Sequence, residues 1–183
     1  MISKERGRGP LLCAIVLGAA LLSNCTPRVQ PGAPSLPAAP SVADAEEIRI
    51  SRGPCFGFCP VYSIAVAPGG QVQFTGERHT TVIGTRSRTV GPAGYEAVRK
   101  SLAPLRPASG TTQDFACDAA ATDMSQVTVE WVSATGARTG FSYNMGCRSP
   151  KGLEINRTVE EQLQKLDGEG WAAQKTWPGA TRG

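Results

Sequence analysis

Histidine is almost absent from this chain: His79 is the only one among 183 residues. A metal site built from several histidines is therefore excluded within one chain, and any histidine-dependent mechanism has to use His79. A Ser-His-Asp arrangement drawing on Asp118 or Asp123 lacks the GxSxG element that presents the serine in many hydrolases. We therefore interpret His79 as a polar residue at a strand start, and the sequence predicts no catalytic residue.

The sequence also lacks a hydrophobic run long enough to cross a bilayer, which takes about 20 apolar residues. The run from Leu11 to Leu22 is about a dozen residues, the length typical of the apolar part of an export signal. The basic residues Lys4, Arg6 and Arg8 precede it. This anatomy predicts a signal peptide over residues 1–24 and an oxidising compartment for the rest of the chain.

The end of this signal resembles the lipobox of bacterial lipoproteins, with the sequence Leu22-Ser23-Asn24-Cys25. The resemblance implies that Cys25 is lipidated, becomes the first residue of the mature chain and attaches it to a membrane. Thr26, in place of an acidic residue, resembles the sorting pattern of outer-membrane lipoproteins. We therefore expect a periplasm-facing domain in the bacterial cell envelope, anchored to the outer membrane. The alternative is an ordinary secretory signal that leaves Cys25 as a thiol.

An excess of charge of one sign is missing as well. The full chain has 19 basic and 15 acidic residues. Residues 1–24 contain three of the basic and one of the acidic residues, so 16 basic and 14 acidic residues remain without them. A net charge near +2 argues against a general nucleic-acid binder, because such proteins are strongly basic. We expect no nucleic acid among the partners.

Prolines recur every three or four residues between Thr26 and Ala45, among alanines and serines. Such a segment favours an extended polyproline II chain and cannot bury a core. We therefore predict that residues 25–45 comprise the lipidated cysteine and a tether. Residues 46–177 have the length of a single domain, and residues 178–183 are expected to be a disordered tail.

Alternating apolar and polar residues predict the first strands of this domain. Segments 47–51, 61–67 and 71–75 alternate, and a Pro-Gly-Gly turn joins the last two into a hairpin. Segment 80–90 reads as a third, more polar strand, interrupted at Gly84 by a turn or bulge.

The second half of the domain mixes helical and strand patterns. A helix is predicted from Gly91-Pro92 to a stop at Pro104, followed by a long loop over 106–123. Two alternating segments, 126–132 and 141–145, predict a hairpin, and Ser149-Pro150 starts a last helix. This order favours an α+β fold: an antiparallel β-sheet with two helices packed on one face, stapled by disulfides.

Aromatic residues at strand positions are expected to form the core of this fold, with Trp171 packing back onto the body. The core aromatics are Tyr62, Phe74, Trp131, Phe141 and Tyr143.

Six cysteines are present, of which one leaves with the signal and one takes the lipid. The remaining four allow three pairings. We favour a pair in the stretch from Gly53 to Tyr62 and a second pair that pins the 106–123 loop to the end of the 141–145 strand. By chain entropy these bridges are worth about 2 and about 3.5 kcal/mol. The expected disulfide residues are Cys55, Cys59, Cys117 and Cys147.

Two other uses of these cysteines remain open. A structural zinc site needs two close cysteine pairs, whereas only Cys55 and Cys59 are close in sequence. A redox-active pair favours CxxC at a helix N-terminus, whereas this pair has three intervening residues and leads into a strand. The aspartates Asp114, Asp118 and Asp123 lack the spacing of an EF-hand. We therefore expect no metal and no cofactor.

The arginines Arg78, Arg86 and Arg88 have even spacing and would share one face of a regular strand. Such a row predicts an anion-binding surface for phosphate or carboxylate groups of an envelope polymer or partner. The alternative is a charged edge strand that protects the sheet against aggregation.

The stretch Gly53-Pro54-Cys55-Phe56-Gly57-Phe58-Cys59-Pro60-Val61-Tyr62 resembles a domain-of-unknown-function family of bacterial envelope proteins marked by GPCxGxCPxY. The resemblance extends over most of residues 47–171. It implies an exported, often lipid-anchored small α+β domain and no activity.

Together these features predict an exported lipoprotein domain with a structural or binding role toward an envelope partner. The alternatives are an envelope thiol-disulfide enzyme that uses Cys55 and Cys59, or a polyanion-binding module that uses the three arginines.

Overall fold

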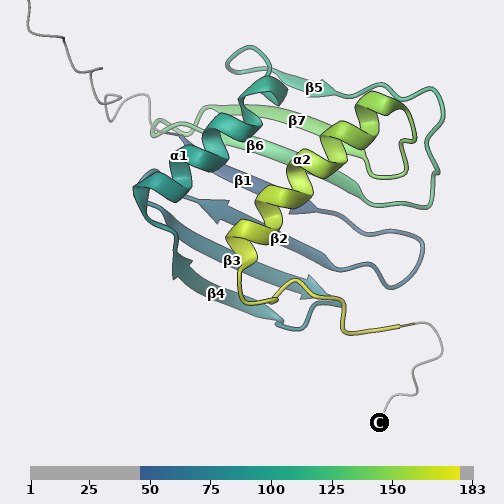
Figure 1. Cartoon of the computed structure of the whole chain (residues 1–183), viewed down its shortest axis with the longest axis horizontal. Helices are drawn as coiled ribbons and strands as arrows, with labels where there is room; N and C mark the ends of the chain where they lie inside the picture. The colour runs from purple at the N-terminus through teal and green to yellow at the C-terminus, as the bar shows by residue number, and fades with distance from the viewer. Residues whose placement is uncertain (1–45, 178–183) are drawn as a thin grey trace, which may run out of the picture. The chain divides into compact units, whose positions relative to one another are not determined.

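The computed structural model describes residues 46–177, and these form one seven-stranded sheet with two helices. The strand order across the sheet is β4-β3-β2-β1-β6-β7-β5, and both helices lie on the same face (Figure 1). The fold class expected from the sequence is therefore confirmed. The elements are β1 (Glu47–Arg52), β2 (Val61–Val66), β3 (Gln71–Arg78), β4 (Gly84–Thr89), α1 (Gly91–Leu102), the 3-10 turn η2 (Ala103–Leu105), β5 (Thr112–Asp114), β6 (Gln126–Val132), β7 (Arg138–Asn144) and α2 (Pro150–Asp167).

The central strand β1 shows how the alternating sequence sets the two faces of the sheet. Ile48 is opposite Val66 of β2 and Trp131 of β6, so all three side chains point to the helix-covered face. Arg49, one residue later, lies on the other face and forms an ion pair with Glu47. A shift of register by one residue would expose the whole apolar set, so the hydrophobic pattern fixes the pairing.

Both helices begin where their sequences predict, and α1 ends at Leu102, before Pro104. Proline occupies the first turn of each, and the Ser149 hydroxyl accepts a hydrogen bond of 3.1 Å from Gly152 N at the start of α2. Gly168 ends α2 with a φ of +49°, in the left-handed region that glycine tolerates best. Of the two helices in residues 46–177, neither is long and apolar enough to cross a membrane.

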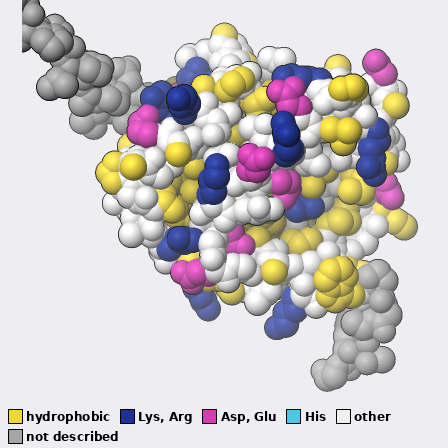
Figure 2. Space-filling view, in the orientation of Figure 1, with side chains coloured by type: hydrophobic (Ala, Val, Ile, Leu, Met, Phe, Trp, Pro, Cys, Tyr) yellow, Lys and Arg dark blue, Asp and Glu magenta, His cyan; other side chains and the backbone are white. Residues whose placement is uncertain are grey.

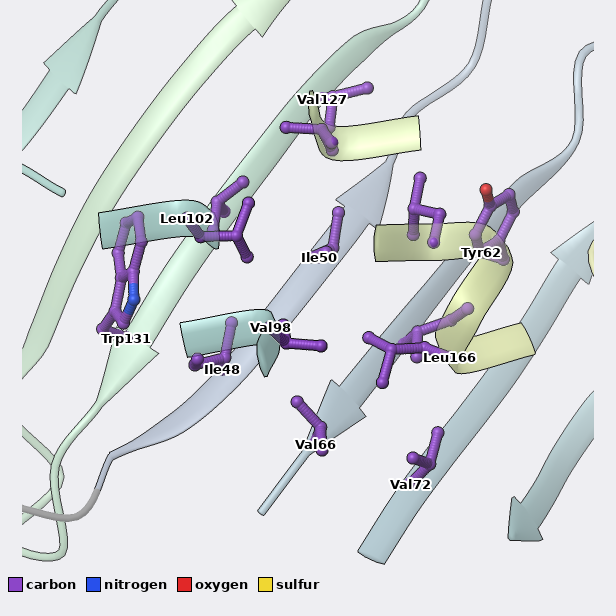
Figure 3. Close-up of a cluster of buried hydrophobic side chains, with 14 of the residues drawn as sticks. Ile48, Ile50, Tyr62, Val66, Val72, Val98, Leu102, Val127, Trp131 and Leu166 are labelled. Carbon is purple, nitrogen blue, oxygen red and sulfur yellow. The ribbon is translucent and has the colours of Figure 1, made fainter. Parts of the chain in front are cut away.

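The core fills the space between the helices and the sheet (Figure 3). The five aromatic residues expected there are all buried, and Trp171 packs against Phe74 with ring centroids 5.8 Å apart. On α2 the side chain of Ile155 is buried in this core, whereas that of Leu153 is 48% exposed. Each fully buried large side chain of this kind contributes roughly 1.5–3 kcal/mol through removal of apolar surface from water.

Two local predictions were wrong. The strand expected over 80–90 begins only at Gly84, because Thr81 and Val82 donate their backbone N–H groups to Ala173 and Trp171 instead of to a neighbouring strand. The predicted loop 106–123 contains the short strand β5, which pairs in parallel with β7. Its three exposed residues are too few to show a periodicity.

The predicted signal peptide over 1–24, the lipidation of Cys25, the tether to residue 45 and the tail 178–183 all lie outside the described residues. They remain predictions.

Candidate functional site

Four loops meet at one end of the sheet, where β1, β3, β5 and β7 finish and β2, β4 and β6 begin. We call this the braced end and define it as the loops 53–60, 79–83, 115–125 and 145–149. The predicted tether joins β1 at Glu47, which is at the opposite end of that strand. Loops presented by a rigid sheet are common positions for binding residues, so this end is the first candidate site.

The first disulfide closes loop 53–60. Cys55 and Cys59 are bonded with their Cα atoms 5.7 Å apart, as the sequence favours. Gly57 between them has a φ of +147°, a conformation that a residue with a side chain rarely adopts. The loop is also fixed to its neighbours, because Phe56 N donates to Asp123 O and Gly53 N to Gln126 O, both at 2.9 Å.

The second disulfide joins two other loops of the same end. Cys117 and Cys147 are bonded with their Cα atoms 5.9 Å apart, which is the favoured long-range pairing. Ala121 N donates to Gly146 O at 3.3 Å beside this bond. A methyl group on Gly152 would meet the Cys147 sulfur at 2.5 Å, so the start of α2 packs directly against the bridge. The two disulfides and these hydrogen bonds hold three loops as one unit.

A polar cluster that sequence reasoning missed lies behind the braced end. Arg52, the last residue of β1, forms an ion pair of 3.5 Å between its Nη1 and Oε1 of Glu160 on α2. Among the described residues, neither Arg52 Nε nor this Glu160 oxygen has a hydrogen-bond partner. The two residues are far apart in the sequence, and no local pattern indicates that they meet.

The ion pair borders a cleft of about 300 Å³ between α2, Pro60 and the segment after α2. Hydroxyl, amide and carboxylate groups line it together with a few apolar side chains, which suits a small polar ligand or water. The lining residues are Arg52, Pro60, Tyr62, Glu160, Leu163, Gln164, Asp167, Ala172, Ala173 and Gln174.

The tyrosines near this cleft are held neutral. Burial raises the pKa of Tyr62 to about 12, and the positive charge of Arg52 offsets part of that increase. Burial also raises the pKa of Tyr143, whose hydroxyl donates to Asn156 Oδ1 at 3.4 Å. Phenols that ionise only at high pH are hydrogen-bonding groups and not general bases near neutrality.

The raised pKa values predict a loss of stability at alkaline pH. An unfolded tyrosine ionises near pH 10, so its folded pKa of about 12 stabilises the native state below pH 10 and ceases to do so as the pH rises to 12. Urea unfolding between pH 8 and 11.5 should therefore show a falling free energy of unfolding from about pH 10 upward. In the Tyr62→Phe/Tyr143→Phe variant, the free energy of unfolding should decrease much less over this pH range. An equally large decrease in the variant would contradict the assignment to these tyrosines.

The three arginines of the predicted anion site do not lie on one strand. Arg78 ends β3, whereas Arg86 and Arg88 lie on β4, opposite Phe74 and Val72. Arg88 is half-buried against Gly168 at the C-terminus of α2, where a cation is favoured by the helix dipole. On the helix-covered face, basic and acidic side chains are interspersed and no basic surface stands out (Figure 2). Anion binding at these residues remains a prediction.

His79 and Asp114 each contact a neighbouring loop or strand. The imidazole ring packs edge-on against Phe58 with centroids 5.3 Å apart, and His79 O accepts a hydrogen bond from Lys175 N. Asp114 accepts a hydrogen bond from the Ser142 hydroxyl on the neighbouring strand β7. Within residues 46–177, no three histidine, cysteine, aspartate or glutamate side chains gather as a metal site would require.

A second polar hollow lies on the sheet face that neither helix covers. It has a volume of about 460 Å³ and is lined mainly by hydroxyl, amide and charged side chains from β1, β2 and β6. Two of its four charged residues, Arg49 and Glu130, are already paired, with Glu47 at 3.0 Å and Arg138 at 3.2 Å. This hollow reaches the braced end at Gly53 and Pro54.

Similarity to a known family covers most of the folded body. The model of a family described as a domain of unknown function (DUF6438) matches residues 46–167, which is more than half of the chain and includes every strand and both helices. No curated protein matches the chain.

Proposed function

This chain belongs to the DUF6438 family of unknown function, and from that premise we propose that it is a lipid-anchored binding domain of the bacterial cell envelope. In this proposal, residues 1–24 direct export, Cys25 carries the lipid and residues 26–45 form a spacer. The folded domain faces the periplasm and binds another envelope component. The resemblance to envelope proteins with the GPCxGxCPxY stretch supports this assignment.

The observation that carries the proposal is that two disulfides brace the same end of the sheet, which lies opposite the end where β1 begins at Glu47. Disulfides persist in oxidising compartments, which is consistent with the export signal. A small domain gains stability from them, and here the gain falls on loops instead of on the sheet. Rigid loops on a stable scaffold reduce the entropy lost on binding, which favours a recognition surface.

A binding role accounts better for this geometry than catalysis does. The Cys55–Cys59 bond lies in a loop that leads into a strand, whereas reactive dithiols gain their low pKa at helix N-termini. His79 packs edge-on against Phe58, and the charges of Arg52 and Glu160 near the cleft are paired with each other. The thiol-disulfide enzyme is retained as the alternative that the following experiment separates.

The experiment is the intact mass of the mature protein isolated from the cell envelope, alkylated with and without prior reduction. We expect a lipid-sized mass excess on Cys25, no alkylation before reduction and four alkyl groups afterwards, since two of the six cysteines are accounted for by the signal and the lipid. Absence of the lipid would overturn the anchor. Alkylation of Cys55 and Cys59 without reduction would instead favour the thiol-disulfide enzyme.

A further inference from the structure

One aromatic side chain of the braced end is almost entirely in water. Phe56 is 93% exposed, the largest fraction among the exposed large hydrophobic residues of the described chain. Leaving an aromatic ring of this size in solvent forgoes roughly 1.5–3 kcal/mol of hydrophobic stabilisation. Single exposed apolar residues are common on protein surfaces, so exposure alone does not assign a role to Phe56.

The backbone under Phe56 is fixed more firmly than in an ordinary loop. The Cys55–Cys59 bond closes the loop on both sides of the residue, and the Phe56 N–H donates to Asp123 O at 2.9 Å. Gly57 N also donates to Cys55 O at 3.0 Å. Because the backbone is already fixed, little backbone entropy is lost when a partner buries this ring.

Further apolar side chains are exposed at the same end. Phe58, two residues on, is 39% exposed while its ring packs edge-on against His79. Ile83 in loop 79–83 is 61% exposed. Trp177, two residues beyond the Lys175 N–H that bonds His79 O, is 59% exposed. Four of the five exposed large hydrophobic residues of the described chain thus belong to this region, and the fifth is Leu153 on α2.

We propose that Phe56 is the anchor of a protein–protein interface and inserts into an apolar pocket of an envelope protein. This inference deepens the proposed function, because it rests on the chain being a binding domain and names the surface and the kind of partner. Aromatic residues at the centre of a patch commonly carry most of the binding energy of an interface. Phe58, Ile83 and Trp177 would surround the anchor and exclude water.

The charges beside Phe56 favour a protein partner over a lipid surface. The neighbouring loop 115–125 carries Asp118 and Asp123, both exposed, and the backbone carbonyl of Asp123 accepts the hydrogen bond from the Phe56 N–H. These two carboxylates outnumber the one exposed arginine of the braced end, Arg148 in loop 145–149. Carboxylates beside the inserting ring would be repelled by anionic headgroups and would be costly to bring into hydrocarbon. A pocket flanked by lysine or arginine complements them instead.

The test is site-specific photo-crosslinking in intact cells with the full-length protein. A benzophenone-bearing phenylalanine replaces Phe56 in one strain and Leu153 in a control strain, because Leu153 is also a large exposed apolar residue. We expect a discrete protein adduct from position 56 at about tenfold or more the yield from position 153, as for a residue at the centre of an interface. The Cys55→Ser/Cys59→Ser background should reduce that yield.

A binding measurement then tests whether Phe56 contributes to the affinity or only lies near the partner. The adduct identifies the partner, whose binding to the purified mature protein is measured with Phe56→Ser and with the control Leu153→Ser. Loss of a central aromatic should weaken binding about 30-fold, and the control should be unchanged. The Asp118→Asn/Asp123→Asn variant should weaken binding more at low salt than at high salt, because salt screens the attraction between exposed charges.

Other outcomes overturn the inference. Equal yields from positions 56 and 153, or no adduct from position 56, would remove Phe56 as an anchor. An adduct with the mass of a phospholipid would assign the patch to a membrane surface, and an adduct with a second copy would assign it to self-association. A protein adduct at position 153 alone would contradict the role of Phe56, but it would still agree with the proposal that the chain is a binding domain.

Discussion

Replacing Cys117 and Cys147 together by serine is expected to lower the free energy of unfolding by about 3.5 kcal/mol. The bond closes a loop with a sequence separation of 30, so its removal releases much conformational freedom to the unfolded chain. Native packing adds to the effect, because Cys147 is 1% exposed and its sulfur packs on Gly152. Urea unfolding of the oxidised mature protein and of the Cys117→Ser/Cys147→Ser variant measures the difference directly.

The other disulfide provides the matched control. Cys55→Ser/Cys59→Ser opens a loop with a separation of only 4 and should cost about 2 kcal/mol by the same relation. Its effect should be local, with faster amide hydrogen exchange at the Phe56 N–H and little change in α2. If the Cys55–Cys59 bond proved to stabilise the protein more than the Cys117–Cys147 bond, loop entropy would not explain their contributions to stability. Differences in strain or packing would then have to account for them.

The sequence predicts this domain best where its pattern is long and repeated. β1, β3 and β6 alternate clearly, so their side-chain faces follow from the sequence alone. Capping residues such as Ser149 and Gly168 mark the ends of α2 equally well. The disulfide pairing was favoured because one pair is close in sequence and the other two cysteines are isolated.

The candidate site could be predicted only in part, because its residues meet through the fold. Arg52 and Glu160 come from β1 and α2, and no periodicity links them. Arg78 was placed on one strand with Arg86, although the turn at His79, with a φ of +59°, separates them.

Arg52→Met alone is expected to lower the free energy of unfolding by about 2 kcal/mol, and Glu160→Leu alone by a similar amount. Either change leaves one charged group without its partner between α2 and the sheet. Removing one partner of a buried pair costs about 3–5 kcal/mol, and of an exposed pair less than about 1. The Arg52 and Glu160 side chains are 19% and 30% exposed, which places this pair between those limits. Urea unfolding of both variants measures these costs.

The double variant Arg52→Met/Glu160→Leu decides what this ion pair contributes. Two apolar side chains of similar volume leave no unpaired charge, so the double change should cost less than either single change. The exposed pair Lys151–Glu154 on the same helix is the control, since it should show almost no coupling. Additive costs for Arg52 and Glu160 would contradict a coupled pair. Coupling would show that an interaction between the end of β1 and α2 stabilises the fold next to the start of loop 53–60.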